Sequence, residues 1–324
     1  PVMIPTWDTS AAANCQQITL PIEGLKGTVT WGDGTKDANP AHTFTTSGQV
    51  TIRIDGTFTK WGAYPGGGWA DADCLISVDR WGNTETADLA YAFTGATRLK
   101  HVESIPPTTT NLSCAFWKVT TPFTLGALDT SKVTTMNYMF GSAAAFNQPV
   151  NFNTSKVKDM GFMFYGAAAF NQPLSFDTSS VENTSYMFSG ASAFNQPLNF
   201  DTSSVTAMHN MFASTTAFDQ PLSFDTSRVT SMTDMFSYAN AFNHPLNFNT
   251  SKVLNMEGMF RGTVNFNQPL NFDTSKVTIM SNMFNGAAKF NRDLSAWNVS
   301  KVTAYANFSK ATPAWKLKQP VWVN

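Results

Sequence analysis

The sequence contains few charged residues for its length. Lys and Arg number 21 among the 324 residues, Asp and Glu number 22, and together they make up 13% of the chain, against about a quarter in ordinary proteins. The net charge of −1 provides no electrostatic attraction for DNA, RNA or an anionic membrane. We therefore expect a surface covered by Asn, Ser, Thr and Gln, with no nucleic acid partner and no membrane insertion.

Cysteine is also scarce. The three cysteines, Cys15, Cys74 and Cys114, fit neither a disulfide framework nor a zinc-binding spacing. A bond between Cys15 and Cys74 across the N-terminal region is one alternative, but the small, odd number of cysteines favours three buried free thiols.

Long apolar runs are missing as well. No segment reaches the length needed to span a membrane, and the first ten residues, PVMIPTWDTS, lack the basic and apolar segments of a signal peptide. The sequence fits either a trimmed chain or a protein made in the cytoplasm, because Pro after an initiator Met favours removal of that Met. The second alternative includes structural proteins of phages and viruses.

Motifs for catalysis are absent. The chain has no GxSxG, Walker or HExxH motif. None of its four histidines is followed by Cys or Glu at a metal-binding spacing. We expect a protein without catalytic residues, metal or cofactor.

The N-terminal region is rich in short stretches of β-branched and aromatic residues. Period-two alternation predicts strands at Gln17–Pro21, Thr28–Trp31 and Val50–Ile54. An Asp-Gly turn signal lies between them in Trp31–Thr35, read WGDGT. We expect a small antiparallel sheet, in which Asp33 accepts hydrogen bonds within the tight turn rather than binding a metal.

A 24-residue repeat dominates the rest of the chain. Its most regular form reads FNQPLNFDTSKVT at Phe266–Thr278 and is followed by a Met-Phe pair. The pair recurs at the same spacing in seven copies, which begin at Met139, Met163, Met187, Met211, Met235, Met259 and Met283. A fixed period of this length is typical of a solenoid, in which each unit buries its apolar face against the next.

The repeat predicts a mainly β, parallel solenoid of about nine to ten coils. We expect one strand at Pro-Leu-Asn-Phe, a second extended segment at Lys-Val-Thr-x-Met, and a turn or single helical turn at Met-Phe-x-Gly-Ala. The recurring Phe, Val and Met residues form the core, and the Asp/Asn-Thr-Ser corner forms an Asx-turn. The domain organisation predicted is a β domain at residues 1–82, the solenoid at residues 83–310 and a C-terminal cap at residues 311–324.

The repeated phrase FNQPLNFDTSKVTxMxxMFxGA resembles the BspA-like leucine-rich-repeat surface proteins of bacteria, over roughly Leu89–Phe308. The pattern WGDGT, then HTF, then GQVTIRI also resembles the PKD-type β-sandwich. Phe44 stands where that module has Tyr, and Gln49 replaces its aromatic residue. The resemblance implies a right-handed leucine-rich-repeat-like solenoid with a role in adhesion or recognition, without catalysis.

Positions that vary between copies are the candidate binding residues, because invariant positions are explained by packing. Aromatic residues occur at or just after the variable pair that precedes Met-Phe, and we predict a ligand-binding strip formed by Tyr138, Phe162, Tyr186, Tyr165 and Tyr238. Partly buried rings that shield the core are the alternative. A column of Gln residues is a second candidate face, or else an amide ladder.

The sequence favours a surface-exposed, extracellular recognition or adhesion protein that binds a protein or glycan of a host or neighbouring cell. A phage or virus structural protein, such as a tail fibre, receptor-binding or decoration protein located in the virion, is the alternative. Oligomer formation or virion assembly is compatible with either. Ice binding by a Thr column (Thr130, Thr154, Thr178, Thr202 and Thr226) is a third hypothesis.

Overall fold

The structure, a computed structural model, describes residues 2–62, 69–82 and 85–323. It consists of two compact units: unit 1 comprises Pro1–Gln148 and Phe152–Val157, and unit 2 comprises Pro149–Asn151 and Lys158–Asn324. The division falls inside the repeat array. The predicted domain boundary at residues 82 and 83 adjoins two residues, 83 and 84, that lie outside the described ranges.

The regular elements of the described residues all lie in unit 1 and are short. They comprise two 3-10 turns, η1 (Ala13–Gln16) and η2 (Ala72–Cys74), and the strands β1 (Val2–Asp8), β2 (Gln17–Thr19), β3 (Ile22–Glu23), β4 (Lys26–Thr30), β5 (Lys36–Asp37), β6 (Ala41–Thr43), β7 (Gln49–Thr51), β8 (Arg53–Thr57), β9 (Lys60–Trp61), β10 (Leu75–Arg80), β11 (His101–Val102) and β12 (Thr124–Leu125). No helix in these ranges has the length and apolar character needed to cross a membrane.

Unit 1 is built around one eight-stranded sheet. Its order is β12-β11-β10-β1-β8-β4-β5, and β7 also pairs with β1. The strands predicted near residues 17, 28 and 50 are present as β2, β4 and the β7–β8 segment, which confirms the β character of this region. The central strand β1 was not among the predicted strands, although its alternating burial shows that it carries one face of the core.

The first coils of the repeat array continue this sheet. Strand β10 pairs in antiparallel fashion with β1, and it pairs in parallel with β11, which in turn pairs in parallel with β12. Ser77, His101 and Thr124 occupy equivalent register positions along this run. The N-terminal β region therefore covers the first coil of the array with a hydrogen-bonded strand, so that this end of the stack is not an open sheet edge.

The WGDGT segment forms the predicted tight turn. Asp33 Oδ1 accepts hydrogen bonds from the Thr35 backbone N–H at 3.0 Å and its hydroxyl at 2.7 Å, and Asp33 Oδ2 lies 2.7 Å from His42 Nε2. These bonds lower the pKa of Asp33 to about 2, with the Thr35 backbone N–H as the largest cause. The carboxylate is thus held by its own turn, as expected for a structural role.

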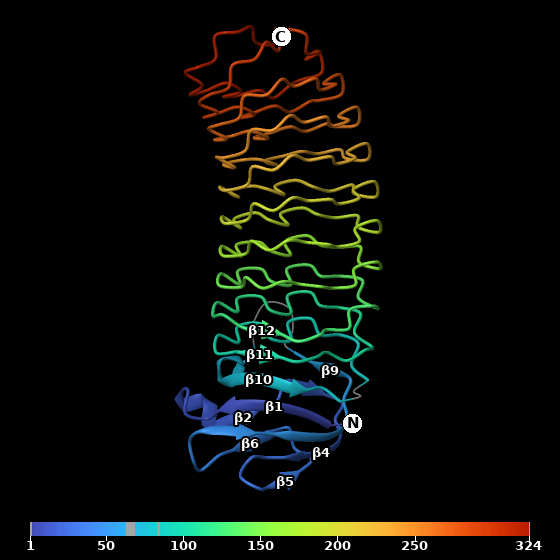
Figure 1. Ribbon diagram of the computed structural model, residues 1–324, viewed down its shortest axis with the longest axis vertical. Coiled ribbons are helices and arrows are strands. Elements are labelled where there is room, and N and C mark those ends of the chain that lie inside the picture. The colour runs from blue at the N-terminus through green and yellow to red at the C-terminus, as the bar shows by residue number, and fades with distance from the viewer. Residues whose placement is uncertain (1, 63–68, 83–84, 324) are drawn as a thin grey trace. The chain divides into compact units, whose positions relative to one another are not determined.

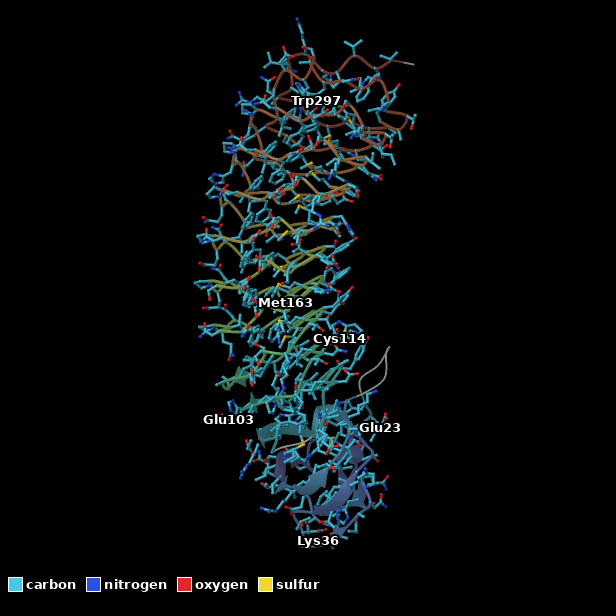
Figure 2. All side chains as sticks on the ribbon, turned by 90° about the vertical axis from the view of Figure 1, so that its right-hand side faces the viewer. Glu23, Lys36, Glu103, Cys114, Met163 and Trp297 are labelled. Carbon is cyan, nitrogen blue, oxygen red and sulfur yellow. A yellow bond between two sulfur atoms is a disulfide. The ribbon has the colours of Figure 1, made fainter. Side chains whose placement is uncertain are left out.

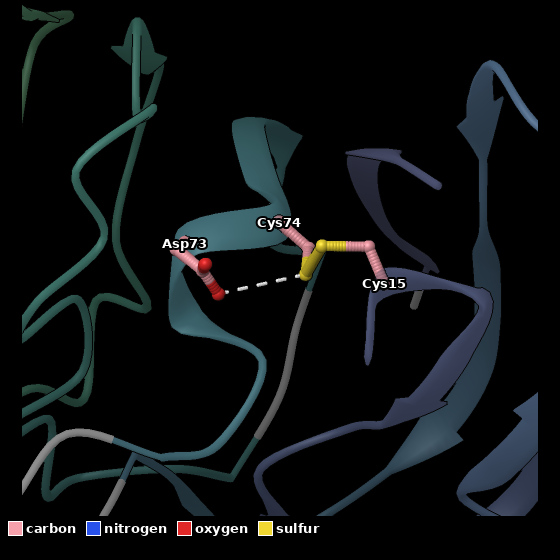
Figure 3. A group of neighbouring side chains, drawn as sticks. All are labelled: Cys15, Asp73 and Cys74. Carbon is pink, nitrogen blue, oxygen red and sulfur yellow. Dashed lines mark hydrogen bonds between the residues drawn. A yellow bond between two sulfur atoms is a disulfide. The ribbon is translucent and has the colours of Figure 1, made fainter. Parts of the chain in front are cut away.

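The expectation of three free thiols was wrong. Cys15, in η1, forms a disulfide with Cys74, in η2, with the two Cα atoms 5.6 Å apart (Figure 3). The two cysteines are 59 residues apart in the sequence, and the fold brings them together. Their separation in the sequence alone does not predict this bond. Cys114 is a buried free cysteine, and burial raises the pKa of its thiol.

Unit 2 consists of stacked 24-residue coils, seen from yellow to red in Figure 1. Alternate backbone N–H groups bond to the next coil: Met160 to Asn183 O, Phe162 to Ser185 O and Phe164 to Met187 O. The N–H groups between them close tight turns within the coil, such as Met163 to Met160 O. The Met-Phe side of each coil is therefore a row of turns, and no helical turn forms there in the described residues.

The strands predicted at Pro-Leu-Asn-Phe and Lys-Val-Thr-x-Met are not formed as regular strands in the described residues of unit 2. Single parallel bridges join the coils instead, such as Asp159 with Asn183. The Pro of each regular copy has no backbone N–H to donate to a strand ladder. Side chains also join the coils; for example, Thr202 Oγ1 donates a hydrogen bond to Asp225 O at 3.0 Å. The fold remains a mainly β repeat protein with stacked coils, but with fewer regular strands than predicted.

The predicted core columns are confirmed. Phe164 and Phe170 stack within one coil with ring centroids 4.0 Å apart, and Phe164 stacks on Phe188 of the next coil at 5.8 Å. The Met and Val columns are buried with them, and Met163, labelled in Figure 2, has no exposed surface. A continuous column of stacked rings thus forms the interior of unit 2.

The Asp/Asn-Thr-Ser corner is the predicted Asx-turn. Oδ1 of Asp177 accepts the backbone N–H of Ser179 at 3.1 Å, and Oδ1 of Asn249 accepts that of Ser251 at the same distance. The Thr between them is buried in every regular copy; Thr202 and Thr226, for example, are 2% and 0% exposed. The Thr column therefore cannot present a flat surface to ice, which overturns that hypothesis.

Candidate functional site

Each described coil passes through a left-handed backbone conformation immediately before its Met-Phe pair, or before the equivalent residues in the divergent coils. The φ angles at this position lie between 50° and 60°, at Tyr91, Cys114, Tyr138, Phe162, Tyr186, Asn210, Asp234, Gly258, Asn282 and Asn307. Asn, Asp and Gly adopt this conformation readily, whereas bulky residues do so at an energetic cost. Three residues of the predicted strip, Tyr138, Phe162 and Tyr186, therefore adopt a backbone conformation that is unfavourable for bulky side chains.

Three predicted site residues form one cluster in unit 2, which we call the aromatic cluster: Phe162, Tyr165 and Tyr186. The rings of Phe162 and Tyr186 stack with centroids 4.4 Å apart and planes inclined by 8°. Tyr165 packs edge-on against both, at 5.7 Å from Phe162 and 6.4 Å from Tyr186. Tyr165 is 38% exposed and the other two are half-buried, so the cluster presents a partly apolar surface.

His209 extends the cluster by one coil. Its ring lies edge-on to Tyr186 with centroids 5.4 Å apart, and its Nδ1 is 3.1 Å from Ser185 Oγ. Partial burial lowers the pKa of His209, so the ring is mostly neutral at pH 7 and adds no net charge to the surface. The sequence interpretation grouped His209 with the variable residues but did not assign it to the strip.

Asp234 is the acidic neighbour of this surface. It has a φ of 50° and is half-buried. Burial raises the pKa of Asp234 above its ordinary value. A hydrogen bond from Ser237 and the charge of Arg261 act in the opposite direction and only partly offset the effect of burial. Gly258, the equivalent residue of the next coil, leaves room for the Asp234 side chain, because a methyl group at Gly258 would overlap the Asp234 carboxylate. Burial raises the pKa of Tyr186 too, and the Asp234 charge adds to this effect.

Tyr138 belongs to unit 1 and packs in a separate row of aromatic residues. Its ring lies 6.4 Å from Trp117, and Trp117 lies 6.4 Å from Tyr91, both edge-on. The ammonium group of Lys118 sits 4.1 Å from the Trp117 ring centroid. The sequence interpretation missed Trp117, because the divergent copy CAFWKV has no Met-Phe pair to mark the position.

Tyr238 lies outside the aromatic cluster. It occupies a second left-handed position, with φ of 58°, where five other coils have Gly95, Gly166, Gly190, Gly262 and Gly286. Its ring is 45% exposed and rests beside Gly262 of the next coil. Tyr165 directly follows its Met-Phe pair, whereas one residue separates Tyr238 from its pair. The two side chains therefore have different neighbours.

The Gln column forms an amide ladder. Asn171 Oδ1 accepts the backbone N–H of Asn195 and the side-chain Nε2 of Gln196, both at 3.0 Å. The next coils repeat the pattern through Asn195 with Gln220 and through Asn243 with Gln268. These side chains hold successive coils together, which supports the structural alternative for this column.

One group in the described residues has side chains close enough to share a metal ion: Cys15, Asp73 and Cys74. The disulfide occupies both sulfur atoms, and Asp73 Oδ1 lies 3.6 Å from Cys74 Sγ (Figure 3). A disulfide sulfur lacks the thiolate that binds metals. The group therefore fits a structural crosslink and provides no metal site.

The comparison with protein families gives one match, to the family described as "Mycoplasma protein of unknown function, DUF285". It matches in four overlapping segments, residues 110–223, 175–248, 198–271 and 246–322. These segments cover more than half of the chain and follow the repeats. The searches of curated proteins and of solved structures give no match.

Proposed function

The chain belongs to the family described as "Mycoplasma protein of unknown function, DUF285", and we propose that it is a non-catalytic recognition protein, displayed on a cell surface, that binds a partner molecule through its aromatic cluster. The proposal includes the finer assignment to BspA-like leucine-rich-repeat surface proteins and an extracellular location. The partner is a protein or glycan of a host or neighbouring cell.

One observation carries the proposal: aromatic residues occupy a left-handed position that other coils fill with Asn, Asp or Gly. A left-handed bulky residue costs about 1–2 kcal/mol, and stacking of one aromatic pair returns about 0.5–1.5 kcal/mol. Phe162 and Tyr186 therefore contribute little to the stability of the coils. Asn210 and Asn282 indicate that the same coil closes without an aromatic ring, which supports a surface role for the rings.

The chemistry of the cluster suits recognition. Rigid, partly exposed aromatic rings lose little conformational entropy on binding and are enriched among the residues that dominate binding energy. The stacked coils beneath hold the rings through backbone hydrogen bonds, such as Tyr186 N–H to His209 O at 3.0 Å. The low charge of the chain favours contacts through rings and amides over ion pairs. The alternative of a virion component stays a prediction, because it rests on the sequence alone.

The test is a binding screen of the purified protein against a glycan array and against intact bacterial and animal cells. The Phe162→Asn/Tyr186→Asn variant installs the residue that Asn210 and Asn282 already provide at this position. We expect retention of the wild-type protein on at least one probe and loss of at least tenfold in the variant. Asn307→Ser is the matched control in the same column and should bind as wild type. Equal retention of the variant and the wild type would exclude the aromatic cluster as the binding surface.

A further inference from the structure

Tyr238 and Arg261 line a shallow pocket of about 380 Å³ in unit 2. Asn240, Gly262, Val264 and Asn285 contribute to its walls. The volume lies in the lower part of the range of small-molecule sites, about 300–1,000 Å³. None of these residues belongs to the aromatic cluster, so the pocket is a second candidate site.

Tyr238 is the one aromatic residue at its position in the described coils. That position is left-handed throughout: it is Gly in five other coils, and Lys118, Ser142, Ser214 and Ala311 occupy it with φ angles of 55° to 60°. Gly262 lies against the ring, where a methyl group would overlap the ring carbons. The ring therefore packs close to the glycine backbone, and Tyr238 remains 45% exposed.

Arg261 provides the charge of the pocket. Its guanidinium carbon lies 5.5 Å from the Tyr238 ring centroid. No carboxylate lies within ion-pair distance of Arg261 in the described residues, although its charge lowers the pKa of Asp234, which also accepts a hydrogen bond from Ser237. The guanidinium, which lies over the Tyr238 ring, is therefore available for two parallel hydrogen bonds to a carboxylate.

Amide groups complete the site. Asn285 Nδ2 donates to Asn282 Oδ1 at 3.1 Å, which orients the Asn285 side chain. Asn240 lies on the same wall and is exposed. Amides both donate and accept hydrogen bonds, as sugar hydroxyls require. Val264, which is 38% exposed, adds an apolar contact that a phosphate or a small inorganic anion would leave unused.

We propose that this pocket binds a sugar that carries a carboxylate, with its ring against Tyr238 and its carboxylate on Arg261. The pocket size, the exposed aromatic ring, the available guanidinium and the two amides match one acidic monosaccharide. This inference names a second site and does not depend on the partner of the aromatic cluster. The sugar is either free or a residue of an acidic polysaccharide.

The test is a titration of the full chain with D-glucuronate, D-glucose and acetate, followed by amide NMR signals. A ligand of this size binds with a dissociation constant of about 1 mM at ordinary efficiency. We expect glucuronate to shift the signals of Gly262 and Gly286 and to bind at least tenfold more tightly than glucose or acetate. A hyaluronan oligosaccharide that binds more tightly than glucuronate would identify a polysaccharide as the source, and equal or weaker binding would identify the free sugar.

Variants separate the roles of the two main residues. Arg261→Gln should remove the preference for glucuronate over glucose, and Arg261→Lys should restore it only in part, because Lys lacks the planar fork. Tyr238→Ser should weaken both sugars. Lys276→Gln, the matched loss of an exposed positive charge in unit 2, should leave binding unchanged, as should Phe162→Asn/Tyr186→Asn. No shift with glucuronate at about 10 mM, or equal shifts with glucose, would overturn the proposal.

Discussion

Tyr186 stacks on Phe162 with ring centroids 4.4 Å apart, although both residues adopt left-handed backbone conformations with φ of 58° and 57°. The stack joins equivalent residues of two successive coils. It is formed outside the buried Phe column, which already fills the interior. The aromatic cluster is therefore an addition to a coil that the core holds together by itself.

This separation predicts a small stability change when the cluster is removed. Phe162→Asn/Tyr186→Asn loses one stacked and three edge-on ring contacts, each worth about 0.5–1.5 kcal/mol, and it relieves two left-handed conformations that cost about 1–2 kcal/mol each. Because the two effects oppose each other, we expect the urea midpoint to stay nearly the same. A marked decrease in the midpoint would show that the rings are part of the structural core.

Replacement in the core column should have the opposite result. Phe188 stacks on Phe194 at 4.2 Å and on Phe212 at 5.8 Å, and none of its surface is exposed. Phe188→Ala leaves a cavity and should lower the free energy of unfolding by about 3–5 kcal/mol. Urea denaturation followed by circular dichroism measures the change, and a loss below about 1 kcal/mol would contradict the assignment of this column to the core.

The disulfide predicts a redox-dependent stability of unit 1. Cys15 and Cys74 close a loop across 59 residues, and removal of a native disulfide typically costs about 2–5 kcal/mol. Cys15→Ser/Cys74→Ser should lower the thermal midpoint of unit 1 and make it insensitive to dithiothreitol. The wild-type protein should become less stable in dithiothreitol. Equal midpoints of the oxidised and reduced wild-type protein would contradict this prediction.

The Asx-turn corners predict a loss of stability in acid. In the folded protein, hydrogen bonds from the Ser227 backbone and hydroxyl lower the pKa of Asp225 below its ordinary value of 3.8. The carboxylate form therefore contributes stability that is fully present above pH 3.8, and that contribution is lost as the pH falls through the lowered pKa.

Asp225→Asn should keep the turn, as Asn249 does in the next coil, and should reduce the loss of stability between about pH 4 and pH 2. Unfolding midpoints across this range provide the measurement. Asn249→Asp is the matched reverse variant, and it should increase the acid loss because it adds one carboxylate to the same corner. If Asp225→Asn loses more stability in acid than the wild type, the Asp225 carboxylate does not stabilise the folded protein as predicted.

The sequence predicted the interior of the array because packing repeats with the chain. Phe, Val and Met recur every 24 residues, and a stacked coil must bury the same side of each copy. The Asx-turns were predicted for a similar reason. Either Asp or Asn occupies the corner in different copies, and the feature they share is a short side-chain oxygen that accepts a backbone hydrogen bond.

The sequence did not predict the backbone of the site. Left-handed φ angles at Phe162 and Tyr186 oppose the local preference of these residues, and they depend on hydrogen bonds to the next coil. The separation of Tyr238 from Tyr165 has the same origin, because alternate residues along each coil face different neighbours. The Cys15–Cys74 pair and strand β1 depend on contacts between distant segments, which short-range patterns do not encode.

The most direct test of the account measures binding and stability on the same Phe162→Asn/Tyr186→Asn sample. The probe is the glycan or cell type that retains the wild-type protein in the binding screen. We expect at least a tenfold loss of retention, with a free energy of unfolding within about 1 kcal/mol of the wild type, because the rings serve the surface and the core holds the coils. Undiminished retention, or a loss of binding that accompanies unfolding, would contradict this prediction.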